Sequence, residues 1–114
     1  MQTMVSTTTK HTPEEVTEIA ARLGARILAA RKARRWRQQE VADRTGYSLV
    51  TVRAVEKGDH RTSLGIYLHV LWIMGLTREV ELIADPGLDR DGLSLTLDAA
   101  DKRVYLPRKV DDAF

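Results

Sequence analysis

The amino-acid sequence predicts an all-α domain followed by a polar tail. Apolar residues recur at helical spacing over most of residues 14–84, and capping residues or glycines separate these stretches. The chain has 114 residues, of which 43% are hydrophobic, so it is long enough for one small core. It is too short for the barrels and doubly wound sheets that need about 200 residues or more.

Several classes of protein are excluded by composition. The chain has no cysteine, which leaves no disulfide framework, no zinc–thiolate site and no thiol nucleophile. The first ten residues lack an apolar core, and no stretch approaches the ~18–20 apolar residues of a membrane span. We therefore expect a cytoplasmic protein without a membrane partner.

Metal and catalytic chemistry are not expected. The three histidines fall in an arm, a loop and a helix without ligand spacing; they are His11, His60 and His69. No nucleophile and no phosphate-binding glycine loop accompanies the available carboxylates. The sequence thus predicts a binding protein that is not an enzyme and needs no cofactor.

The charge is distributed unevenly along the chain. Residues 1–61 hold 12 Lys or Arg and 7 Asp or Glu, a net +5, whereas residues 62–114 hold 6 and 9, a net −3. Five basic residues crowd into the seven positions 31–37. This polarity indicates one surface that faces a polyanion, with a solvated charge run as the open alternative.

The first helix is expected to run to about Arg35, after a flexible arm at residues 1–11. Thr12 is suited to cap it, Pro13 to occupy its first position and Glu15 to complete a capping box. Its apolar positions recur every three or four residues and are Val16, Ile19, Ala20, Leu23, Ile27 and Ala30.

Two short helices are expected next, at residues 38–45 and 49–57. Gly46 suits a left-handed turn between them, and Ser48 is a natural cap for the second. The positions expected to face inward are Val41, Ala42, Val52 and Val55.

A fourth helix, residues 64–74, is apolar on nearly every side and should bury more than one face. Tyr67 and Trp72 are therefore expected in the core rather than at a dimer contact. A fifth helix is expected at residues 78–84, with Thr77 as its cap.

The C-terminal region has a different texture. Apolar and polar residues alternate over Leu93–Leu97, which predicts a short strand that needs a partner to be stable. Residues 98–114 are charged, should be mobile and end in Phe114, which we expect to anchor a partner protein. The expected organisation is an arm at residues 1–11, a domain at 12–86 and a dimer- or partner-contacting segment at 87–114.

The spacing within residues 38–58 is that of a helix-turn-helix. A small residue lets the two helices cross closely, a glycine turns the chain four residues later, and two valines fix the second helix onto the first. The residues at these positions resemble the pattern of the Xre family, the Cro/CI-type repressors: Gln38, Ala42, Gly46, Ser48, Val52, Glu56 and Gly58. The resemblance covers about residues 16–84 and implies a five-helix, lambda-repressor-like domain that binds DNA, with Glu56 in a structural position.

The resemblance also assigns residues to the DNA. It places Gln38 and Ser48 at phosphates, and the positions at or beside the bases are Leu49, Val50, Thr51, Arg53 and Ala54. Leu49 and Val50 depart from the family, which usually has polar residues there, and can pack on thymine methyls instead. Arg53 is then the expected hydrogen-bonding base reader, with guanine as its favoured target.

The basic run is expected to lie near the DNA backbone. Arg34, Arg35 and Arg37 fall at the end of the first helix and the entry to the second, although positive charge at a helix C-terminus is favourable without a ligand. Arg31 and Lys32 are left open between the two roles, and Trp36 is expected as a core or hinge residue.

The continuation from Gly58 to Leu64 resembles the HipB-type antitoxins within this family. This implies a homodimer that represses its own operon at a palindromic, double-stranded operator, near the nucleoid, and that binds a HipA-type kinase toxin. Two alternatives stay open: a stand-alone transcription regulator, and an interaction module that has lost DNA binding.

Overall fold

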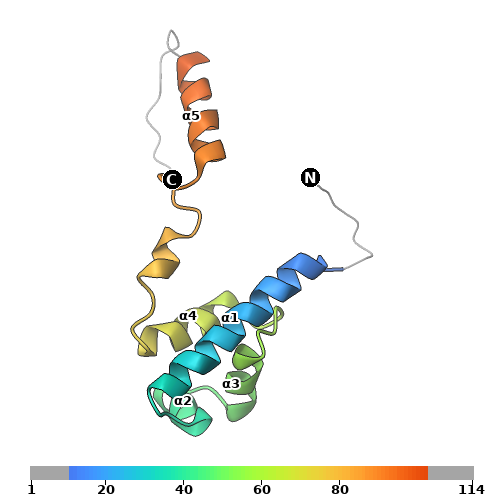
Figure 1. Ribbon diagram of the computed structural model, residues 1–114, viewed down its shortest axis with the longest axis vertical. Helices are drawn as coiled ribbons and strands as arrows, with labels where there is room; N and C mark the ends of the chain where they lie inside the picture. Colours follow the sequence, from blue (N-terminus) through green and yellow to red (C-terminus); the bar gives the residue numbers. More distant parts are fainter. Residues whose placement is uncertain (1–10, 103–114) are drawn as a thin grey trace. The chain divides into compact units, whose positions relative to one another are not determined.

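The computed structural model describes residues 11–102, all of whose regular elements are helical (Figure 1). The chain divides after Thr77 into two compact units. The elements are α1 (Glu14–Ala33), α2 (Gln38–Thr45), α3 (Leu49–Glu56), α4 (Leu64–Ile73), a 3₁₀ helix η1 (Glu79–Leu82) and α5 (Arg90–Lys102). The predicted all-α class is confirmed, and α1 to α4 agree with a Cro/CI-like domain.

In the first unit α3 packs against α1, and α2 packs against both α3 and α4, while the first turns of α1 extend beyond the other helices (Figure 1). Its core is aliphatic apart from one tyrosine and one methionine. The buried apolar residues are Ile27, Val41, Ala42, Val52, Val55, Tyr67, Val70, Leu71 and Met74. All four inward positions predicted for α2 and α3 are among them.

The start of α1 differs from the prediction. The helix begins at Glu14 with Pro13, not Thr12, in the capping position, and no side chain caps it. The Pro13 carbonyl accepts hydrogen bonds from the amides of Val16 and Thr17 at 3.0 and 3.3 Å. Proline fits this place because it needs no amide hydrogen there and its φ of −56° is its natural value.

The ends of α3 and α4 are closed by glycines in the left-handed region. Gly58 and Gly75 have φ of 70° and 73°. The amide one residue further on returns to the last turn in each case, from Asp59 to Ala54 at 3.0 Å and from Leu76 to Leu71 at 2.9 Å. These are Schellman-type ends, which satisfy carbonyls that the helix itself leaves without donors.

Gly58 has a second function, because it lies against Gly24 of α1. A Cβ atom placed on Gly24 would lie 2.3 Å from the Gly58 nitrogen and 2.6 Å from the Val55 oxygen. A Cβ on Gly58 would lie 2.1 Å from the Ala20 oxygen. The crossing of α1 over the end of α3 therefore brings backbone against backbone and has no room for a side chain.

Helix α4 corrects one prediction about the core. Tyr67 is buried as expected, and its hydroxyl donates to the Asp59 carbonyl at 2.7 Å. Trp72, however, is 66% exposed, and Leu64 is exposed with it. An apolar pattern on every side cannot indicate which side faces the core, and α4 turns Tyr67, Val70 and Leu71 inward.

The second unit differs from the predicted structure in two places. The fifth helix expected at residues 78–84 is one turn of 3₁₀ helix, Glu79–Leu82, with Arg78 rather than Thr77 at its start. The strand expected at Leu93–Leu97 is wrong, because these residues lie in α5. Within residues 11–102 there is no strand with which to pair.

The helical alternative for residues 93–97 has a local cause. The Asp89 carboxylate accepts the Gly92 amide hydrogen at 2.9 Å, and the Asp89 carbonyl accepts that of Leu93 at 2.8 Å. These bonds satisfy amides at the start of the helix, as a capping aspartate does. Leu93 and Leu97 also lie one helical turn apart, so five alternating residues suited either structure.

We predict that Gly24→Ala destabilises the domain by about 2–3 kcal/mol, because the added methyl group overpacks a backbone contact. Exposed glycine-to-alanine changes within helices normally raise the free energy of unfolding by about 1 kcal/mol. A decrease for Gly24→Ala would therefore indicate overpacking. Urea denaturation followed by circular dichroism measures the difference. Gly65→Ala is the matched control, since the nearest atom to its added Cβ is Ser63 Oγ at 4.0 Å; equal midpoints for the two variants would contradict the packing argument.

Candidate nucleic-acid interface

Helices α2 and α3 are joined by a turn of three residues, 46–48. Gly46 adopts φ 86° and its amide donates to the Ala42 carbonyl at 2.8 Å, which ends α2. Ser48 Oγ accepts the Thr51 amide hydrogen at 3.1 Å, which caps α3 as predicted. Local hydrogen bonds thus end α2 and start α3 on either side of the turn.

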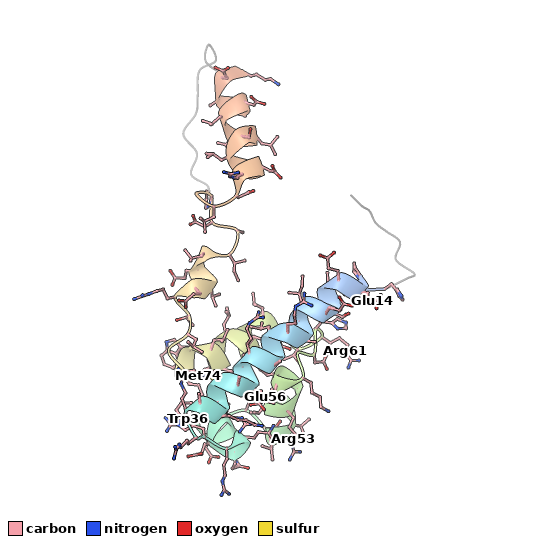
Figure 2. The ribbon with its side chains drawn as sticks, in the orientation of Figure 1. Glu14, Trp36, Arg53, Glu56, Arg61 and Met74 are labelled. Atoms are coloured by element: carbon pink, nitrogen blue, oxygen red, sulfur yellow. The ribbon has the colours of Figure 1, made fainter. Side chains whose placement is uncertain are left out.

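The inner face of α3 is locked into the domain. Val52 and Val55 are almost completely buried against α1 and α2. Glu56 lies on the same side and is only 6% exposed. Figure 2 shows Glu56 between α1 and α3, and Arg53 on the outside of the domain.

A buried ion pair joins α1 to α3. Arg31 donates from Nε to Glu56 Oε2, and from Nη2 to Glu56 Oε1 at 3.0 Å. Its Nη1 donates to the Trp36 carbonyl at 2.9 Å, so the guanidinium also holds the chain between α1 and α2. Arg31, which the sequence left open, is therefore a structural residue, and Glu56 has the structural role that the resemblance implied.

Gln38 joins the same network from the start of α2. Its Nε2 donates to Glu56 Oε1 at 2.9 Å, and its side chain is half-buried. A phosphate oxygen accepts hydrogen bonds, so only the side-chain NH2 group of Gln38 could bind it, and that group already donates to Glu56. The phosphate contact of Gln38 stays a prediction. Ser48 is similar, because its hydroxyl donates to Thr51 Oγ1 at 3.0 Å while capping α3.

The side of α3 that faces solvent carries both apolar and basic side chains. Val50 is 72% exposed, Arg53 and Lys57 are exposed, and Ala54 is half-buried. We call these four residues the outer face of α3. Leu49 and Thr51, the other predicted base-reading residues, are half-buried beside it. A helix with one side anchored and the other open is what entry into a DNA major groove about 12 Å wide requires.

The three arginines predicted at phosphates have different surroundings. Arg34 donates to the carbonyls of Ala30 and Met74, each at 2.9 Å, and so ties α1 to the end of α4. Arg35 and Arg37 are exposed. Arg37 precedes α2, where the Glu40 carboxylate accepts its amide hydrogen at 2.6 Å. Phosphate contact stays a prediction for all three, with Arg34 already committed to bonds inside the domain.

Arg35 is in a conformation that glycine usually adopts. Its φ is 59°, and it occupies the place that Gly58 and Gly75 hold at the ends of α3 and α4. The Trp36 amide returns to the Arg31 carbonyl at 3.2 Å, and the Arg35 amide to Lys32 at 2.9 Å. An arginine there costs about 1 kcal/mol relative to glycine, so its guanidinium is retained against a local penalty.

Trp36 is half-buried, and its ring serves as a platform for a charge. The guanidinium carbon of Arg44 lies 4.2 Å from the centre of the ring. This cation–π contact holds Arg44, on the last turn of α2, beside the basic turn that contains Arg35 and Arg37. Arg44 was not predicted from the sequence; Trp36 lies in the connection before α2, and Arg44 lies in the last turn of α2.

Two further charged residues, not predicted from the sequence, lie at the end of α3. Lys57 belongs to the outer face, one turn after Arg53. Asp59 accepts hydrogen bonds from Arg61, from Nε and Nη2 at 3.1 Å each and from the backbone amide at 2.9 Å. These bonds lower the pKa of Asp59 to about 2, so its carboxylate stays ionised and neutralised by Arg61 at neutral pH.

Three further expectations concern a partner anchor, a metal site and a membrane span. Phe114 lies outside the described residues. In residues 11–102, no three His, Asp or Glu side chains come together as metal ligands. None of the helices described there combines the length and the apolarity needed to cross a bilayer.

The fold, the short turn between α2 and α3 and the exposed outer face of α3 are those of a helix-turn-helix domain. Residues 27–67 match the family model described as helix-turn-helix, the Cro/CI type, and this segment contains the ion pair, the turn and α3. The match supports an Xre-like domain and with it DNA binding and transcription regulation. No curated protein and no solved structure matched the chain.

We predict that Arg31→Met destabilises the domain by about 3–5 kcal/mol, because it leaves the Glu56 carboxylate buried without its cation. The double variant Arg31→Met with Glu56→Met should recover much of this loss, since no unpaired charge remains. Urea denaturation of both variants measures the effect. Lys32→Met, which removes an exposed charge from the next residue of α1, is the control. A double variant no more stable than Arg31→Met would show that the buried charge is not the cause.

Proposed function

We propose that this protein is a sequence-specific transcriptional repressor that binds double-stranded operator DNA through the outer face of α3. The observation that carries the proposal is the two-sided nature of α3, with one side fixed by Val52, Val55 and Glu56 and the other open to solvent. The family-model match over residues 27–67 supports the same assignment. The protein acts as a binding protein without catalysis of its own, in the cytoplasm at the nucleoid.

In this proposal the basic turn supplies affinity and α3 supplies sequence discrimination. Arg35 and Arg37 neutralise phosphates, with Gln38 and Ser48 as neutral phosphate contacts. Arg53 reads a base edge, for which a guanine offers two acceptors. Arg34 contributes its positive charge near the DNA backbone, while its hydrogen bonds to the Ala30 and Met74 carbonyls remain inside the domain.

We further propose that the protein binds as a homodimer. Two recognition helices about 34 Å apart reach successive major grooves on one side of the duplex, which a palindromic operator requires. Helix α5 supports a partner-contacting role, because it has no buried residue and exposes Leu93 and Leu97 on one side. Such a 13-residue helix is marginally stable in water unless something packs on it. Sedimentation equilibrium at micromolar concentration tests the dimer, and a monomer contradicts it.

The separate roles of base and phosphate contacts give a direct test. Arg53→Ala should lose about 1–3 kcal/mol of operator affinity and relax the preference at one base pair. Arg35→Gly should weaken binding to all sequences alike and make the slope of log affinity against log salt about one unit shallower. Titrations of labelled duplexes at several salt concentrations measure both.

Arg35→Gly carries its own folding control. Glycine is favoured at φ 59°, so the variant should unfold at higher urea concentration, with a gain of about 0.5–1 kcal/mol. A variant that is more stable and binds DNA more weakly separates binding from folding. Unchanged DNA affinity would remove Arg35 from the interface.

The finer proposal is that this repressor is the antitoxin of a HipA-type kinase toxin and regulates their shared operon. The resemblance of residues 58–64 to HipB-type antitoxins and the net −3 of residues 62–114 support a protein partner besides DNA. The alternative is a stand-alone Xre-type regulator. A kinase-like reading frame beside the gene separates the two.

We predict that removal of residues 107–114 weakens binding of that kinase at least tenfold and leaves operator affinity unchanged, because the truncated segment includes the proposed anchor Phe114. Calorimetry with the purified kinase and titration of operator DNA provide the two measurements. Phe114→Ala in the full chain separates the anchor from the rest of the segment. An equal loss of DNA affinity on truncation would instead assign the segment to operator binding or dimerisation.

A further inference from the structure

Val50 is an apolar residue in a place where packing does not require one. It is the second residue of α3 and is 72% exposed, whereas the other two valines of that helix, Val52 and Val55, are at most 1% exposed. An exposed β-branched residue slightly disfavours a helix and leaves apolar surface in water. Packing within the domain therefore gives no reason for a valine here.

Val50 lines a shallow hollow on the surface of the domain. The hollow has a volume of about 260 Å³ and is lined by Val50, Arg53, Ala54, Lys57 and Asp59. Val50 and Ala54 are four residues apart and so lie side by side on one helix face, as do Arg53 and Lys57. The hollow therefore has an apolar strip beside a basic strip.

The acidic residue at this hollow does not cancel its basic strip. Asp59 directs both carboxylate oxygens to the guanidinium of Arg61, and Oδ1 also accepts the Arg61 amide hydrogen. Its charge is thus matched by a neighbour in the loop, not by Arg53 or Lys57. These two cations remain available to acceptors on a ligand.

Major-groove edges of base pairs offer one apolar group, the methyl group on C5 of a pyrimidine. The acceptors of guanine, N7 and O6, are the groups that an arginine binds with two hydrogen bonds. An apolar strip next to an arginine therefore matches a methylated pyrimidine next to a guanine.

We propose that Val50 and Ala54 contact the C5-methyl group of a pyrimidine beside the guanine read by Arg53. This inference rests on the proposed function and specifies the half-site that α3 recognises. The two side chains neither donate nor accept a hydrogen bond, so they sense the methyl group and not the O4 or N4 atom that distinguishes thymine from cytosine. Thymine and 5-methylcytosine are then equivalent at this contact, and cytosine methylation at the site strengthens binding.

The test uses the full chain and a duplex obtained by selection from a randomised library. Each pyrimidine of the selected half-site is replaced in turn to give four duplexes with thymine, uracil, 5-methylcytosine or cytosine, each with its complementary purine. At one position we expect uracil to bind about three- to fivefold more weakly than thymine, the value of one buried methyl group. The same factor is expected between cytosine and 5-methylcytosine.

Val50→Ala should reduce the thymine–uracil ratio at that position to below about two, because only the smaller contact through Ala54 and the new alanine remains. Val16→Ala is the matched control, because Val16 is another exposed valine near a helix start and lies on α1, outside the hollow. Both are exposed enough for the variants to fold, which urea denaturation verifies. The control should retain the full ratio.

The outcomes separate this inference from the function on which it rests. Absence of salt-dependent DNA binding overturns both. Salt-dependent binding without a selected sequence, or equal affinity for thymine and uracil at every position, overturns the methyl contact and leaves DNA binding standing. An undiminished ratio in Val50→Ala shows that Val50 does not contact the methyl group and also overturns the inference.

Discussion

The buried pair of Arg31 and Glu56 fixes the position of the helix that would enter DNA. Burial of either charge alone would be strongly unfavourable, so the two side chains must lie together. The side-chain amide of Gln38 donates a further hydrogen bond to the Glu56 carboxylate. Because these three residues belong to α1, α2 and α3, one network links the helices. A shift of α3 by a single residue would leave a charge unpaired, so the pair sets its register as well as contributing to its stability.

Backbone geometry then removes the remaining freedom of α3. Its start is set by the Ser48 cap, and its end by Gly58, which lies directly against Gly24 of α1. A helix of only eight residues is unstable by itself and needs such anchoring at both ends. With the inner face and both ends committed, Val50, Arg53, Ala54 and Lys57 are left to solvent. The proposed recognition surface is thus the part of α3 that packing leaves free.

Sequence patterns predicted the features that depend on neighbours in the chain. The Gly46 turn and the Ser48 cap are local structures, and each residue type has a specific backbone or hydrogen-bonding reason for its place. The roles of Arg31 and Trp72 depend instead on which side of a helix meets another element. Arg31 stands in a run of basic residues, so its burial could not be predicted from the sequence. Trp72 stands in a helix that is apolar on nearly every side, so its exposure could not be predicted either. Residues 93–97 were ambiguous because five alternating residues suit a strand or a helix equally.

The number of basic side chains left free by the fold limits how tightly one copy of the domain can bind DNA. In the basic run at residues 31–37, Arg31 is buried, and Arg34 is exposed but bonded to backbone carbonyls. The other three basic residues, Lys32, Arg35 and Arg37, are exposed. Non-specific affinity scales with the number of phosphates neutralised, so a single copy has a modest electrostatic contribution. Arg35 has a left-handed conformation at some cost to folding, which is consistent with its proposed contact with a phosphate. Two copies on a symmetric site double this contribution by repeating the same contacts, which is the physical argument for the proposed dimer over a solitary domain.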